Sequence, residues 1–239
     1  MKSMFLIVAC LAASSFNARA GNDLDQLRAL VQSEFADLSK DLGAALSYKP
    51  VSPSIALGLT GFDLGVEITA TELAHSELLD KASSGSATNV LPVPKLHLHK
   101  GLPLDFDIGA SVAWVPGSDI RVWGGEVRYA IVNGGLVTPT IALRGSFSTL
   151  QGVDQLDFDT YGVDLSISKG LVNVTPYAGI GAVYVDSSPN GVAGLKGETS
   201  TLSKVYGGLN VNFLIGNLAA EIDRTGKSTT LGLKFGWRF

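Results

Sequence analysis

Apolar and polar residues alternate most clearly in the last stretch of the chain, Ser228 to Phe239. Because successive side chains of a β-strand point to opposite faces, this alternation predicts a strand with one fully apolar face. The residues on that face are Leu231, Leu233, Phe235, Trp237 and Phe239. A free apolar edge strand is an aggregation hazard for a soluble protein, whereas in a closed membrane barrel the same face contacts lipid.

The same period of two recurs from Gly43 onward and predicts an all-β fold, an antiparallel transmembrane β-barrel of twelve strands over residues 43–239. Most stretches reach the ~9–11 residues that a tilted membrane strand needs. Ten strands is the alternative, because Pro50 and Pro53 interrupt the first two stretches and 54–71 could be one strand bulged at Gly61. The predicted strands are 43–49, 54–60, 62–71, 90–100, 104–116, 119–132, 136–149, 155–169, 171–186, 200–215, 217–225 and 228–239.

The connections between these strands differ in length at the two ends of the barrel. The long links are 72–89 and 187–199, and both fall at the end opposite Phe239. The connections beside the C-terminus are short. Short periplasmic turns and longer outer loops are typical of bacterial membrane barrels, so we expect Phe239 at the periplasmic side.

One stretch, residues 21–42, has helical periodicity instead. Its apolar residues recur at spacings of three and four, which predicts an amphipathic helix. The stripe is shorter than three heptads, so a coiled coil that joins protomers is disfavoured. We expect the helix either to pack against the periplasmic rim of the barrel or to plug its lumen. The stripe consists of Leu24, Leu27, Val31, Phe35, Leu38 and Leu42.

Residues 1–20 have the features of a secretory signal peptide. A basic start precedes the apolar run Phe5–Ala13, and Ala18-Arg19-Ala20 supplies small residues at the cleavage site, so we expect the mature chain to begin at Gly21. A rival interpretation takes Cys10 as the cysteine of a lipoprotein box. It leaves an apolar region of about five residues, shorter than the usual ~7–15.

The composition agrees with a membrane barrel. Hydrophobic residues make up 46% of the chain, yet no mature segment approaches the ~18 uninterrupted apolar residues of a helical span, so the apolar residues must alternate. Removing Lys2 and Arg19 with the signal leaves 16 basic residues against 22 acidic ones, a net charge of −6. This excess of acid argues against nucleic acid as a partner.

The C-terminal strand resembles the assembly signal of Gram-negative outer-membrane β-barrels, whose last residue is usually Phe. The mature chain as a whole resembles small porin-like barrels of an uncharacterised family, in stretches such as Lys100–Pro103 and Gly125–Ala130. The resemblance implies the cell outer membrane, contact with its lipid and recognition by the barrel assembly machinery, but no substrate. The residues that carry the signal are Leu233, Phe235, Trp237 and Phe239.

The inward parity of the strands is rich in charge of both signs. Such a mixed lumen favours cross-strand ion pairs in a narrow barrel over an ion-selective pore, which would favour one sign. Across the turn at 133–135, Glu126 and Arg144 are expected to be neighbours. The predicted lumen-lining residues are Glu67, Lys95, His97, His99, Asp105, Asp107, Glu126, Arg128, Arg144, Asp164, Lys204, Glu221, Asp223 and Lys234.

Four of these side chains, His97, His99, Asp105 and Asp107, are predicted to share one face of a single hairpin. Two imidazoles and two carboxylates could bind a divalent metal, or form His–Asp pairs that change charge near neutral pH. Polar filling of the lumen is the simpler interpretation, since His at a spacing of two is common on a polar strand face. We therefore predict no resident metal and no cofactor, with these four as weak candidates.

For function, the sequence favours a passive or gated channel for small solutes. The alternatives are a structural or adhesive barrel whose lumen is closed by ion pairs, and FadL-like passage of apolar molecules. We predict no catalytic residues. His75 lies in the first long loop beside Ser76 and Glu77, but neighbours in sequence would not share a strand face.

Overall fold

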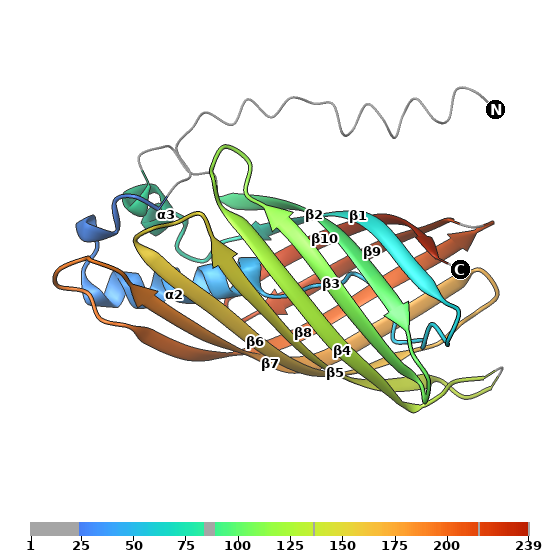
Figure 1. The fold of residues 1–239 in the computed structure, drawn as a ribbon. Coiled ribbons are helices and arrows are strands. Elements are labelled where there is room, and N and C mark those ends of the chain that lie inside the picture. The colour runs from blue at the N-terminus through green and yellow to red at the C-terminus, as the bar shows by residue number, and fades with distance from the viewer. Residues whose placement is uncertain (1–23, 84–88, 136, 215, 239) are drawn as a thin grey trace, which may run out of the picture.

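The computed structural model describes residues 24–83, 89–135, 137–214 and 216–238, and in them ten antiparallel strands form a closed barrel (Figure 1). Each strand pairs with the next in sequence, and β1 closes the ring against β10. The strands are β1 (Phe62–Glu72), β2 (Val90–Gly101), β3 (Phe106–Trp114), β4 (Arg121–Val132), β5 (Thr140–Gln151), β6 (Leu156–Ser168), β7 (Val174–Pro189), β8 (Glu198–Phe213), β9 (Gly216–Thr225) and β10 (Ser228–Arg238).

The predicted count of twelve strands is wrong and the alternative of ten is confirmed. The two extra strands, 43–49 and 54–60, do not form. The first is lost because a helix continues through Leu46, and in place of the second, residues 47–61 form no strand. Pro50 and Pro53 lack the N–H that a ladder requires, which agrees with this extended course.

The pleat of the strands separates an apolar outer face from a buried inner face. In β10, Leu233 is 59% exposed while the adjacent Lys234 is 2% exposed. Aromatic rings flank the apolar face: near one end of the barrel Phe213 stacks on Phe235, which meets Trp237 edge to face. Large apolar side chains with this exposure are in keeping with lipid as their solvent, and aromatic belts mark its interfaces.

The two ends of the barrel differ, and we call them outer and inner. The long connections 73–89 and 190–197 leave the outer end, together with the two-residue turn between β9 and β10. Arg238, the start of β1 and the β2–β3 turn lie at the inner end, as the pairings Asp63↔Arg238 and Gly101↔Asp107 require. Phe239 itself lies outside the described residues.

The N-terminal part of the chain is helical, but not over the predicted range. A 3₁₀ turn, η1 (Leu27–Ala29), precedes the helix α2 (Gln32–Leu46), so helical structure begins later and ends four residues later than 42. Glu34 caps the start of α2 by accepting a hydrogen bond from the backbone N–H of Val31 at 3.0 Å. A short helix, α3 (Ser76–Ala82), lies in the β1–β2 loop. None of the described helices has the length and apolar character needed to cross a membrane.

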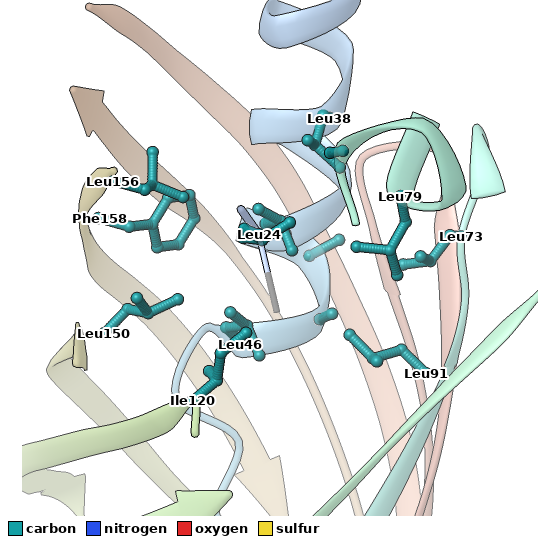
Figure 2. Packing of buried hydrophobic residues seen from close by; sticks show 14 of the residues in the cluster. Leu24, Leu38, Leu46, Leu73, Leu79, Leu91, Ile120, Leu150, Leu156 and Phe158 are labelled. Carbon is teal, nitrogen blue, oxygen red and sulfur yellow. The ribbon is translucent and has the colours of Figure 1, made fainter. Parts of the chain in front are cut away.

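The helix α2 lies inside the outer half of the barrel, where its apolar side chains join the inward side chains of the wall (Figure 2). Figure 2 shows Leu24 and Leu46 from the N-terminal segment on the side of Leu150 and Phe158, and Leu38 on the side of Leu79. All of these residues are buried. The main apolar core of the protein is therefore built between the barrel wall and the chain's own N-terminal segment.

After Leu46 the chain continues through the lumen to the start of β1. The helix ends at Leu46, and the N–H of Ser47, the residue that caps it, donates to the Gly43 carbonyl. Residues 47–54 are all buried. Residues 24–61, which we call the plug segment, therefore enter at the outer end and reach the inner end.

Candidate functional site in the barrel lumen

The lumen of the inner half is a network of buried charged side chains. On three neighbouring strands, Lys95, Glu67, His97, Asp63 and Lys234 form a continuous chain of contacts. Glu67 forms an ion pair with Lys95 at 2.8 Å and lies 2.8 Å from His97 Nδ1, while Asp63 lies 3.3 Å from His97 Nε2. Lys234 donates to the other oxygen of Asp63 at 2.9 Å. Basic and acidic side chains alternate along the chain, so each buried carboxylate has a basic neighbour.

A second network crosses the lumen between strands that are not adjacent. Arg144 of β5 donates to Asp164 at 2.8 Å and lies 3.5 Å from Glu126. The hydroxyl of Tyr206, on β8, donates to the same Asp164 at 2.7 Å. The ring of Tyr206 passes over Gly179 of β7, where an added Cβ would lie 2.4 Å from it. Glycine at this position is therefore required by the close approach of the ring.

The plug segment is bound to both networks. Tyr48 Oη lies 3.0 Å from His99 Nε2, and His99 lies 3.5 Å from Glu126. Lys204 donates to the carbonyl of Tyr48 at 3.3 Å, and Lys95 donates to the carbonyl of Lys49. The backbone of residues 48 and 49 thus uses lumen lysines in place of a strand partner, which satisfies its buried carbonyl groups.

Farther along the plug segment, the inner end of the barrel holds the extended chain in the same way. Arg128 donates to the carbonyl of Pro53 at 3.0 Å and to Asp107 at 2.8 Å. Asp107 in turn accepts from the N–H of Leu57 at 3.0 Å. Arg238 donates to the carbonyl of Ile55 at 2.9 Å. The charged lumen residues therefore bond the plug segment as much as they bond one another.

Little space remains beside the plug segment. A cavity of about 20 Å³ lies where α2 ends, lined by residues that include Tyr48, Lys95 and Ser111. This is room for about one water molecule. In the described residues, the path from the outer loops to the inner rim is occupied by protein.

The structure brings most of the predicted lumen residues inside but moves one of them. Asp105 lies in the β2–β3 turn with a positive φ of 61°, where it accepts from Asn133 at 2.8 Å near the surface. The turn is longer than the sequence suggested and takes this residue out of the strand. The predicted residues that are buried in the lumen are Glu67, Lys95, His97, His99, Asp107, Glu126, Arg128, Arg144, Asp164, Lys204, Glu221, Asp223 and Lys234.

The four weak metal candidates do not meet. The register places His97 opposite Ser111 and His99 opposite Gly109, so the carboxylates near the two rings come from other strands. Liganding atoms of His97, His99 and Asp63 lie within 4.8 Å of one another. Lys234 already neutralises Asp63 there, so a cation at this point would face a buried ammonium group.

Sequence reasoning missed the apolar lining of the outer half. Along β2 the inward residues are Leu91 and Val93 before Lys95, and along β4 Val122 precedes Glu126. The sequence contains this pattern, because the inward residues of several strands change from apolar to charged midway along the strand. The apolar part of the inward face gives the apolar stripe of the amphipathic helix a surface to pack against.

Near the outer rim, the predicted loop residues have structural contacts. His75 Nδ1 lies 3.3 Å from Asp41 of α2, and Ser76 donates to Asn89 at 2.9 Å. Outside the membrane-spanning strands, the hydrogen bond from Lys81 lowers the pKa of Glu34, which helps to keep this ion pair charged. The His75–Asp41 and Lys81–Glu34 contacts tie α2 to the β1–β2 loop.

An exposed apolar band, flanked by aromatic rings, surrounds a closed ring of strands with a buried polar interior. Only lipid provides a favourable solvent for such a band, and only a closed barrel can cross lipid with strands. The protein is an outer-membrane β-barrel. The cleavage of residues 1–20 concerns a part of the chain outside the described residues and stays a prediction.

No known family model matches the sequence, and no curated protein matches it. Several solved structures are similar to it in fold. An outer-membrane channel from Pseudomonas putida F1 is 11% identical, with 81% of this chain and 98% of the channel covered and a TM-score of 0.49. The β-barrel domain of Pseudomonas aeruginosa OprF is 13% identical, with 74% and 97% covered and a TM-score of 0.39. The translocator domain of autotransporter NalP from Neisseria meningitidis is 10% identical, with 87% and 97% covered and a TM-score of 0.41. Similarity at this level does not indicate what this barrel binds or transports.

Proposed function

We propose that this outer-membrane barrel is a gated channel for small solutes, and that the plug segment, residues 24–61, is its gate. The observation that carries the proposal is the filling of the lumen by a segment that is joined covalently to the barrel only at Phe62. Such a segment can leave the lumen without breaking any strand pairing. A permanently open passive pore gains no support from a lumen filled in this way.

The lining of the lumen supports this role. With the plug segment displaced, the inner half would expose charged side chains such as Lys95, Arg128 and Asp107, which water solvates readily. The outer half would expose an apolar ring that includes Val183 and Val185. Hydrophobic constrictions exclude water, so the outer half favours the closed state while the inner half can conduct.

A disulfide lock tests the gate. The hydroxyl of Ser39 on α2 donates to that of Ser187 on β7, with the two oxygens 3.0 Å apart in a buried contact. Because the two side chains touch, we expect a Ser39→Cys/Ser187→Cys variant to form a disulfide bond between α2 and β7 on oxidation. The chain's one native cysteine, Cys10, is replaced by Ser to leave no competing thiol.

The measurement is conductance of the full chain in a planar bilayer under applied voltage. We expect openings in the reduced state and their loss on oxidation, because the lock holds α2 against the wall. The Ser39→Cys single variant should respond to voltage alike in both states. Equal conductance of reduced and fully oxidised protein would refute the plug segment as gate.

The second candidate is a barrel without transport, whose lumen is permanently closed. The buried network around Arg144, which links β4, β5, β6 and β8 across the lumen, favours it. In the same experiment such a barrel stays silent in the reduced state at all voltages, although it is folded and inserted. That result would replace the gated channel with the closed structural barrel.

A further inference from the structure

The start of the plug segment is held at the outer end of the barrel by the β1–β2 loop. At the outer end, the N–H of Gln26 donates to the carbonyl of Ala82 in α3 at 2.9 Å. Lys81, also in α3, donates to Glu34 at 2.6 Å. The first helical residues therefore pack on the β1–β2 loop, and Figure 1 shows α2 and α3 at the same end of the barrel.

Two further outer connections hold the same part of the chain. The N–H of Lys196, in the β7–β8 loop, donates to the side chain of Gln32 at 2.9 Å. Ser228, directly after the β9–β10 turn, donates to Asp41 at 3.2 Å. Three connections that are far apart in sequence thus place the start of the plug segment at one end of the barrel.

The other end of the plug segment lies at the opposite mouth. Leu57 bonds Asp107 beside the β2–β3 turn, and Ile55 bonds Arg238 at the end of β10. The segment therefore spans the barrel lengthwise. Because the long loops face outward in these barrels and β1 begins at the periplasmic side, the N-terminal end of the segment lies outside the cell.

We propose that the barrel presents residues 24–31 on the cell surface, with α2 as the anchor that holds this presented segment in the lumen. The exposed side chains Asp25, Arg28 and Val31 would then face the medium beside α3. This surface-display function does not depend on the gate, because it requires only the closed arrangement. It also implies that the N-terminal end of the segment crosses the membrane plane inside the lumen during assembly.

Cysteine labelling of intact cells tests the direction. In the Cys10→Ser background, single variants Arg28→Cys, Asp154→Cys and Val172→Cys are treated with a membrane-impermeant maleimide. Asp154 is exposed in the β5–β6 outer connection, and Val172 is fully exposed in the β6–β7 turn at the inner end. A second variant of the segment, Ser33→Cys at the start of α2, is exposed as well.

We expect Arg28→Cys and Asp154→Cys to be labelled to the same extent in intact cells, and Val172→Cys only after the outer membrane is permeabilised. Assembly of each variant is checked by its heat-dependent shift in electrophoresis. If Arg28→Cys does not assemble, Ser33→Cys takes its place with the same expectation. Labelling of Asp154→Cys without labelling of the plug variant would overturn the proposal, and so would labelling of Val172→Cys in intact cells.

Discussion

The contact between Gly43 of α2 and Val185 of β7 decides how closely the helix approaches the wall. A Cβ at Gly43 would lie 2.4 Å from one γ-carbon of Val185 and 3.3 Å from the other. Val185 is fully buried and branched at Cβ, so it has little freedom to move aside. We predict that Gly43→Ala and Val185→Ala compensate each other when they are combined.

The expected free energies separate the steric clash at Val185 from the gain in helix propensity at position 43. Inserting one methyl group into a packed core costs about 1–3 kcal/mol, while replacing a helical glycine by alanine gains about 1 kcal/mol. Gly43→Ala alone is therefore expected to cost between about 0 and 2 kcal/mol. Val185→Ala removes two methyl groups and should cost about 1–3 kcal/mol. The double variant should be more stable than the sum of the two by about 1–3 kcal/mol, because the gain in helix propensity cancels in the cycle.

The assay is urea unfolding of the refolded full chain in lipid vesicles, followed by tryptophan fluorescence. A matched control combines Gly43→Ala with Val163→Ala, a lipid-facing valine that is 53% exposed. That pair should be additive within about 0.5 kcal/mol. If the Gly43/Val185 pair is equally additive, α2 does not pack on β7 as described, and the reasoning about the plug segment is refuted.

Two further substitutions test the wall of the barrel. Leu233→Arg places a charge on the lipid face near the midplane and should destabilise by about 2–4 kcal/mol, whereas Thr229→Arg, on the same face near the outer turn, should cost about 0–1 kcal/mol; equal costs in vesicle unfolding would contradict the assigned faces. Arg144→Met removes the buried cation shared by Asp164 and Glu126 and should cost about 3–5 kcal/mol, measured in the same way. Adding Asp164→Asn should recover part of this cost, and a loss below about 1 kcal/mol for Arg144→Met would show that the network contributes little.

The barrel could be predicted because its dominant interaction is local in sequence. The alternation around Leu233 fixes which side chains meet lipid, and Gly226-Lys227 forms the two-residue turn between the predicted strands 217–225 and 228–239. Glu126 and Arg144 are neighbours across their turn, as expected from strand pairing, with 3.5 Å between them. The two-residue period of the strands determines which side chains face lipid, and the turn length determines which side chains of neighbouring strands pair.

The content of the lumen could not be predicted in the same way, since it depends on contacts across the barrel. The apolar stripe of residues 24–42 predicts a buried helix face but not the surface that covers it. His97 finds Asp63 and Glu67 on β1, in place of the aspartates of its own hairpin, because the turn length shifts the β2–β3 register. The course of residues 47–61 depends on side chains such as Arg128 and Lys204, which replace the strand partners that this stretch lacks.

The most direct measurement of the central claim, that the plug segment fills the lumen, is disulfide formation between Ser39→Cys and Ser187→Cys in isolated outer membranes. Mild oxidation followed by mass spectrometry of the digested barrel should find this link in nearly all molecules. The control pair Ser33→Cys/Ser187→Cys should not link, because Ser33 is exposed at the start of α2. Failure of the Ser39/Ser187 pair to link in folded barrels, or equal linking of both pairs, would contradict a helix seated in the lumen.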